Sequence, residues 1–205
     1  LLARQHAGET PGSWVLDGLM REFARTRNQR AIVWVVPMID VDGIARGEYG
    51  RDGSNFGFDA AWDDSTNRHE VTVPRRDIAR WKERCEPYLA LEFRAPGASA
   101  SDGLFAAIPN CEDKAGLHKK SAGWGNHLAN FITKKYAAPK FVPSTESKNH
   151  WRASGFTNWV SGHLGICALT INAPYALAGE EILSRKCYRE AGKHIAAAIV
   201  DRLKQ

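Results

Sequence analysis

The chain has 205 residues, a formal net charge of +5 and a pI near 9.1. Hydrophobic residues make up 43% of it and charged residues 25%, which is ordinary for a globular domain with a sizeable core. No apolar run approaches the ~20 residues that a membrane span requires, and the modest positive charge is not by itself a nucleic-acid signature. The composition therefore predicts a single domain over residues 1–205, with neither a membrane nor a nucleic acid among its partners.

Strands and helices are expected to alternate, because short apolar runs are followed by longer stretches with helical spacing. The expected elements are a strand at 1–6, a helix at 11–28, a buried strand at 31–38, a long Gly/Asp/Asn-rich loop at 40–70, a helix at 73–86 with Pro74 in its first turn, strands at 89–93 and 105–108, a helix within 115–136, a strand at 165–171 and a helix at 180–203. This order predicts an α/β fold, a three-layer αβα domain with a mixed central sheet covered by helices on both faces.

A His-x-x-Glu pair, His6 and Glu9, lies where the first strand ends and a Gly/Pro turn leads into the first helix. A neutral imidazole nitrogen and a carboxylate both suit zinc, at roughly 2.0–2.2 Å. The alternative is a polar turn that caps the helix, with Thr10 as N-cap and Pro11 at the first helical position. The turn is therefore a candidate metal site or a helix cap.

Four further stretches of the chain carry recognisable motifs, at residues 35–44 (VVPMIDVDGI), 58–62 (FDAAW), 88–97 (YLALEFRAPG) and 168–175 (ALTINAPY). Together with the turn at His6 and Glu9, they resemble the zinc carboxypeptidase family, which includes carboxypeptidase A, the cytosolic carboxypeptidases and small bacterial relatives. The resemblance implies a zinc-carboxypeptidase-like fold, with His6 and Glu9 at the positions of two zinc ligands. Family members carry additional strands and a helix before this turn, so the 205 residues are expected to lack those upstream strands.

The departures from the family pattern fall on the residues that carry its chemistry. Arg94 stands at the position of the third zinc ligand, a His in the family. Asp59 and Ala60 replace the Asn-Arg pair that holds the substrate's terminal carboxylate, and Asn172 replaces the Glu that acts as general base. Arg51 matches a basic residue of the bacterial relatives, although a solvated surface arginine explains it equally well. The resemblance therefore implies a carboxypeptidase-like fold in which most of the catalytic residues have been replaced.

Elementary chemistry indicates what these replacements cost. A guanidinium stays protonated and repels a dication, so Arg94 is expected to pair with Glu9 or Glu92 and to fill the former metal site. An amide cannot take a proton from water at neutral pH, so Asn172 is not expected to act as a general base. Zinc binding is accordingly expected to be weak or absent, and the strand ends that carry His6, Arg94 and Asn172 are expected to converge.

Two functions remain open from the sequence. The first is a pseudoenzyme with a degraded catalytic site that binds a peptide-like ligand or a protein partner without efficient cleavage. The alternative is a hydrolase, either a metallocarboxypeptidase or an amide hydrolase, with a rearranged zinc site. Whether the chain is an enzyme is therefore not decided by the sequence.

The four cysteines, Cys85, Cys111, Cys167 and Cys187, show no C-x-x-C spacing. Buried free thiols are common in apolar strands and helices, so this usage favours a reduced, cytoplasmic setting. A disulfide between two of them is the alternative, and a signal upstream of Leu1 would change the expected compartment.

Overall fold

The computed structural model describes residues 1–26, 31–49, 57–62, 68–97, 99–110, 115–142 and 155–204, so Arg51 and Cys111 lie outside the described residues. In chain order the elements are β1 (Leu2–Ala3), α1 (Thr10–Thr26), α2 (Val41–Arg46), α3 (Phe58–Ala61), α4 (His69–Arg84), β2 (Ala90–Arg94), β3 (Phe105–Ala107), α5 (Ala115–Phe131), α6 (Gly155–Leu164), β4 (Ala168–Asn172), β5 (Leu177–Ala178), β6 (Glu181–Ile182) and α7 (Arg185–Arg202).

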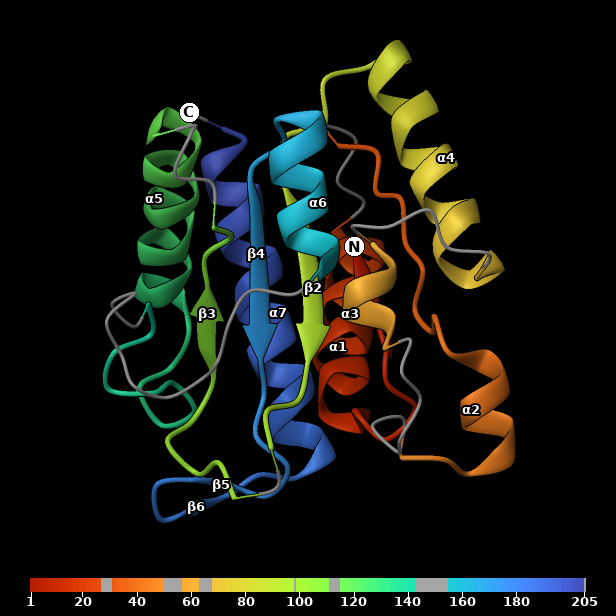
Figure 1. The fold of residues 1–205 in the computed structure, drawn as a ribbon. Helices are drawn as coiled ribbons and strands as arrows, with labels where there is room; N and C mark the ends of the chain where they lie inside the picture. Colours follow the sequence, from red (N-terminus) through yellow and green to blue (C-terminus); the bar gives the residue numbers. More distant parts are fainter. Residues whose placement is uncertain are drawn as a thin grey trace.

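The central sheet has the strand order β1-β2-β4-β3 (Figure 1). The first three strands are parallel, and β3 runs antiparallel to β4, so the sheet is mixed as the sequence predicts. In the register of β2 and β4, Phe93 lies beside Ile171 and Arg94 lies beside Asn172. Strands β5 and β6 form a separate antiparallel pair. The parallel strands therefore end at one edge, where ligands bind in open α/β sheets.

Helices cover both faces of this sheet, which confirms the predicted α/β class with a mixed central sheet (Figure 1). Odd-numbered residues of β2 and β4, such as Phe93 and Ile171, pack into a core shared with α1, α5 and α7. The even-numbered residues face the opposite side, where a second apolar cluster joins α3, α4 and α6. Near the carboxyl ends of the strands this second face becomes polar, since Glu92, Arg94 and Thr170 take the even positions there.

Helices α1 and α7 lie side by side and touch through two glycines. A Cβ atom on Gly18 would lie 2.1 Å from the backbone oxygen of Arg189, and one on Gly192 would lie 1.9 Å from the backbone oxygen of Val15. Real Cβ atoms do not approach other atoms that closely, so only glycine allows these two backbones to meet. This contact seats α1, and hence the turn at its start, against the rest of the domain.

Several expected elements differ from the observed ones. The buried strand expected at 31–38 is absent as a strand, because only an isolated bridge between Val36 and Leu2 joins it to the sheet. The long loop expected at 40–70 contains the short helices α2 and α3, and α4 already begins at His69. Pro74 therefore lies inside α4 and not in its first turn. In the first turn a proline costs no hydrogen bond, because the N–H groups there have no partner within the helix. Helix α6 was not expected, since its sequence mixes apolar and polar residues with weak periodicity.

The described cysteines Cys85, Cys167 and Cys187 are free thiols. None of the described helices combines the length and the apolar character needed to cross a membrane.

Gly192→Ala tests the contact between α1 and α7. We expect the free energy of unfolding to fall by about 1–3 kcal/mol or more, because the added methyl forces two helix backbones apart. Gly162→Ala is the matched control, since no atom lies within 4 Å of a Cβ there and the residue is exposed on α6. That control should gain up to ~1 kcal/mol of stability from helix propensity. Equal urea midpoints for the two variants would contradict the proposed contact.

Candidate functional site

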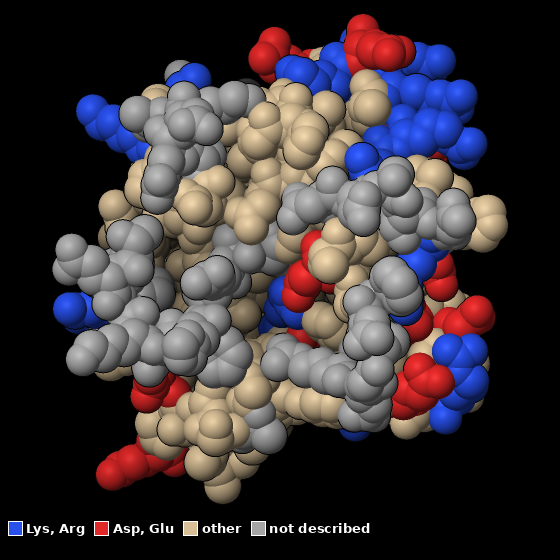
Figure 2. Space-filling view, viewed as in Figure 1, with Lys and Arg blue, Asp and Glu red and all other residues tan. Residues whose placement is uncertain are grey.

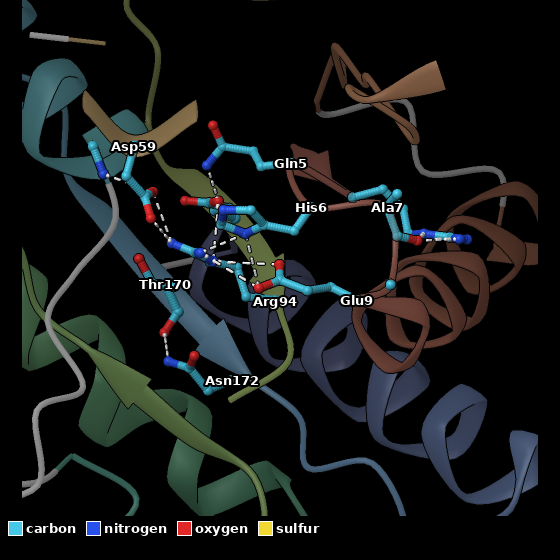
Figure 3. A network of polar contacts seen from close by, with 12 residues as sticks. Gln5, His6, Ala7, Glu9, Asp59, Arg94, Thr170 and Asn172 are labelled. Carbon is cyan, nitrogen blue, oxygen red and sulfur yellow. Dashed lines mark hydrogen bonds and ion pairs between the residues drawn. The ribbon is translucent and has the colours of Figure 1, made fainter. Parts of the chain in front are cut away.

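A cluster of polar side chains lies at the carboxyl edge of the sheet (Figure 3). The turn between β1 and α1 contributes Gln5, His6 and Glu9, the end of β2 contributes Arg94, and α3 contributes Asp59. His6, Glu9 and Arg94 are buried, with 6%, 1% and 7% of their surfaces exposed. Three segments that are far apart in sequence, namely the turn after β1, the end of β2 and helix α3, thus meet at this edge.

The turn holds His6 and Glu9 against each other. His6 Nδ1 lies 3.0 Å from Glu9 Oε1, and the backbone N–H of Glu9 donates to the backbone oxygen of His6 at 3.0 Å. The N–H of Gly8 donates to the backbone oxygen of Tyr49 at 2.9 Å, which ties the turn to the segment after α2. Glu9 also precedes the first residue of α1, where the helix dipole favours a negative charge. The turn is therefore both a helix start and a preformed pair of metal-type donors.

Arg94 contacts every charged member of the cluster. Its Nε donates to Glu9 Oε2 and its Nη2 to Glu9 Oε1, each at 3.4 Å. Its Nη1 donates to both carboxylate oxygens of Asp59, at 2.8 and 2.9 Å. Its Nε also lies 3.8 Å from Glu92 Oε1. The ion pair expected from the sequence is thus present, and it includes Asp59 in addition to the two glutamates.

His6 Nδ1 has two polar neighbours with opposite requirements. Arg94 Nη2 lies 2.8 Å from it, and a guanidinium nitrogen can only donate a hydrogen bond. Glu9 Oε1 lies 3.0 Å from the same nitrogen, and an ionised carboxylate can only accept. His6 Nδ1 and Glu9 Oε1, the two metal-type donors of the turn, therefore both lie against the guanidinium of Arg94.

The charge of this buried cluster is set by Arg94 and Glu92. Burial disfavours the charged form of Arg94, but the carboxylates of Glu9, Glu92 and Asp59 outweigh it and raise its pKa. Burial raises the pKa of Glu92 to about 8, against the opposing pull of Arg94. The pKa of Glu92 thus lies well above that of an ordinary carboxyl, because the burial outweighs the attraction of Arg94. Gln5 Nε2 bonds to Glu92 Oε1 in turn.

Two residues of this network were not predicted from the sequence. Gln5 is the neighbour of His6 in sequence, and its side-chain amide bridges two other residues. It accepts a hydrogen bond from the indole N–H of Trp62 and donates one to the carboxyl of Glu92. Both Gln5 and Trp62 have no exposed surface. Trp62 belongs to the matched FDAAW stretch, yet nothing in that stretch indicates that its ring nitrogen has a buried partner.

The remaining predicted site residues are placed as follows. Asn172 is the register neighbour of Arg94, and Arg94 contacts His6, so the three strand ends do converge. The Asn172 side chain turns along its own strand, with Nδ2 donating to the backbone oxygen of Thr170 at 3.4 Å (Figure 3). Ala60 is exposed on α3 and offers no side-chain hydrogen bond to a carboxylate. Arg51 is outside the described residues.

The chain is similar to known proteins in its three-dimensional structure. No protein-family model matches the chain, and no curated protein matches it. Among solved structures, a metallo-carboxypeptidase from Burkholderia cenocepacia matches 99% of this chain with a TM-score of 0.76 and 16% identity. A metallo-carboxypeptidase from Pseudomonas aeruginosa, in complex with (2-guanidinoethylmercapto)succinic acid, matches 98% with a TM-score of 0.73 and 20% identity. The chain has the metallo-carboxypeptidase fold.

More distant structures have the same architecture. The succinylglutamate desuccinylase from Chromobacterium violaceum matches 94% of this chain, with a TM-score of 0.58 and 16% identity. This chain spans 57% of the Burkholderia protein, 56% of the Pseudomonas protein and 60% of the desuccinylase. At these identities the comparisons establish the fold, and the activities of those proteins do not transfer with it.

The residues of the site do not fit the zinc ion that this fold implies. A catalytic zinc site uses three protein ligands and keeps a further position open for water. Here the guanidinium of Arg94 bonds to both His6 and Glu9, and it is a fixed positive charge. Within the described part of the chain, no three His, Cys, Asp or Glu side chains are grouped so as to hold a metal ion. The two remaining donors face an arginine in place of a metal.

Arg94→Met tests whether the cluster depends on its one guanidinium. We expect the free energy of unfolding to fall by about 3–5 kcal/mol, because the change removes the guanidinium that bonds to the buried carboxylate of Glu9. Arg21→Met is the control, since Arg21 pairs with Asp17 on the surface with 67% of its side chain exposed, and its loss should have a much smaller effect. Chemical denaturation of both variants provides the comparison, and similar stabilities would show that the cluster is not a stabilising ion pair.

The pKa of Glu92 predicts a pH dependence of stability. Its ordinary value of 4.5 applies to the unfolded chain, whereas the folded value is about 8, so the native state binds the extra proton between these limits. The free energy of unfolding should therefore decrease as the pH rises from about 5 to 8. Glu92→Gln, which mimics the protonated acid, should flatten this decrease. Glu86→Gln, a change at an exposed carboxyl, should leave it intact, and an unchanged slope in Glu92→Gln would exclude Glu92 as its source.

Proposed function

We propose that this chain is a catalytically inactive, zinc-carboxypeptidase-like protein that binds a peptide-like ligand or a protein partner without cleaving it. The observation that carries this proposal is the guanidinium of Arg94, which bonds to His6, Glu9 and Asp59 at the carboxyl edge of the sheet. In this arrangement an internal cation takes the structural place of the metal, so the fold needs no ion to neutralise Glu9.

The lack of catalysis follows from what the neighbouring residues cannot do. Family-type hydrolysis needs a metal-activated water, a base for its proton and a cation for the substrate carboxylate. Asn172 is not a base at neutral pH, and its side chain is turned towards Thr170. Ala60 has no cationic group, and Asp59 places a negative charge nearby. Each of these losses alone removes several kcal/mol of transition-state stabilisation, by order of magnitude.

The surface above the cluster supports a binding role. The Asp59 side chain is 43% exposed, although both of its oxygens bond to Arg94, so the cluster reaches solvent on that side. Figure 2 shows acidic and basic side chains near the middle of this face. A ligand that enters there meets an ion pair and not a free cation. We therefore expect it to present a neutral or amide group to Asp59, and not the free carboxylate of a peptide C-terminus.

Metal content tests the first part of the proposal. The protein, purified without added metal, should contain far less than one zinc per chain by elemental analysis, because Arg94 repels the ion. Arg94→His should raise zinc affinity measurably in calorimetry, since it restores a third ligand next to His6 and Glu9. Arg94→Met removes the same positive charge without adding a ligand and serves as the control. Stoichiometric zinc in the unmodified chain would overturn the proposal.

Peptidase assays test the second part. We expect no release of C-terminal residues above background from a panel of peptides, with or without added zinc. The triple variant Arg94→His, Ala60→Arg and Asn172→Glu restores the family residues and is expected to recover a trace of activity. Robust, chelator-sensitive hydrolysis by the unmodified chain would instead establish the alternative, a carboxypeptidase or amide hydrolase with a rearranged zinc site.

A further inference from the structure

The carboxylate of Asp59 has the surroundings of a bound ligand (Figure 3). Arg94 Nη1 donates to both of its oxygens, at 2.8 and 2.9 Å. The backbone N–H of Gly155, the first residue of α6, donates to Asp59 Oδ1 at 3.3 Å. Proteins bind external carboxylates with the same two kinds of group, a guanidinium and the N–H groups at the start of a helix. Asp59 is thus a carboxylate of the chain itself in a site of this type.

The guanidinium of this site is held in place by groups other than Asp59. Arg94 Nε donates to Glu9 Oε2 and Nη2 to Glu9 Oε1, each at 3.4 Å, and Nη2 lies 2.8 Å from His6 Nδ1. The Arg94 side chain is 9% exposed, so these contacts are made in the interior. Two of the three guanidinium nitrogens therefore fix its plane, and Nη1 keeps its direction when the carboxylate of Asp59 is removed.

The start of α6 is likewise positioned without the carboxylate. A Cβ atom on Gly155 would lie 1.9 Å from the backbone oxygen of Asp59, so the backbones of α3 and α6 are in direct contact. The ring of Trp62, at the end of α3, packs against the rings of Phe156 and Trp159, with centroids 4.9 and 5.6 Å apart. These contacts use the backbone at Asp59 and aromatic rings, so the N–H of Gly155 stays where it is when the side chain is shortened.

The exposed part of this site is Asp59 itself. Its side chain is 43% exposed, whereas that of Arg94 is 9% exposed. Replacement of Asp59 by alanine removes a fragment with the size and charge of formate. The change leaves the N–H groups of Arg94 Nη1 without these acceptors, which is unfavourable for a buried donor. An external carboxylate that enters from solvent restores the hydrogen bonds.

We propose that Arg94 Nη1 and the first N–H of α6 form a carboxylate-binding site that the chain fills with its own Asp59. Asp59 is then a specificity-determining residue: its charge excludes a ligand with a free carboxylate, and its exposed side accepts hydrogen bonds from a donor such as a peptide N–H. The statement about the native ligand rests on the proposed function, because it concerns the same site. The carboxylate-binding site itself follows from the contacts of Asp59 alone.

Formate, the fragment that Asp59→Ala removes, is the probe. In calorimetric titrations, formate should bind Asp59→Ala at least about tenfold more tightly than it binds the unmodified chain. The urea midpoint of the variant should rise with formate and not with chloride at the same ionic strength. Asp59→Asn removes the charge but keeps the volume of the side chain, so it should bind formate no better than the unmodified chain does. Equal formate affinity of Asp59→Ala and the unmodified chain, or of Asp59→Ala and Asp59→Asn, would overturn the proposal.

Asp77→Ala is the matched control on the surface. The Asp77 side chain is 40% exposed and lies 3.6 Å from Arg76, but the Arg76 side chain is 57% exposed, so its loss leaves no buried donor. Formate should not stabilise this variant, and an effect as large as in Asp59→Ala would contradict a specific site. Should Asp59→Ala not fold by circular dichroism, its folded fraction should rise with formate and not with chloride, and no rise would overturn the proposal. These measurements use neither zinc nor a peptidase assay, so their failure is distinct from a failure of the proposed function.

Discussion

The buried guanidinium of Arg94 is the interaction on which the site depends. It pairs with both Glu9 and Asp59, and its fixed positive charge stabilises the buried carboxylate of Glu9. Arg94 Nη2 also lies 2.8 Å from His6 Nδ1, so the imidazole is packed against the same guanidinium. A single side chain thereby pairs with carboxylates of the turn, of α3 and of its own strand. Such a cluster is costly to break, since removal of one member leaves the others buried and uncompensated.

The alternation of side chains along β2 and β4 explains how such a polar cluster coexists with a large core. Odd positions in these strands pack against α1, α5 and α7, where the contact through Gly18 and Gly192 brings the helices close. Even positions face the other layer and carry the polar groups near the strand ends. Glu92 is buried among these polar groups, where burial raises its pKa and where Gln5 bonds to it. Its nearest positive charge is the guanidinium of Arg94, with Nε 3.8 Å from Glu92 Oε1.

The sequence by itself predicted the α/β class, the convergence of the strand ends and the pairing of Arg94 with Glu9 or Glu92, because the class follows from local periodicity and the other two follow from the resemblance and from the charge at a few matched positions. It did not reveal that residues 31–36 form no regular strand and join β1 through an isolated bridge at Val36, since an apolar run by itself does not specify its hydrogen-bond partners. Nor did it reveal the bond of Arg94 to Asp59 or the link from Trp62 through Gln5 to Glu92. Those partners are 35, 57 and 87 residues apart, and only the tertiary structure, which brings separate segments to one edge, decides such long-range contacts.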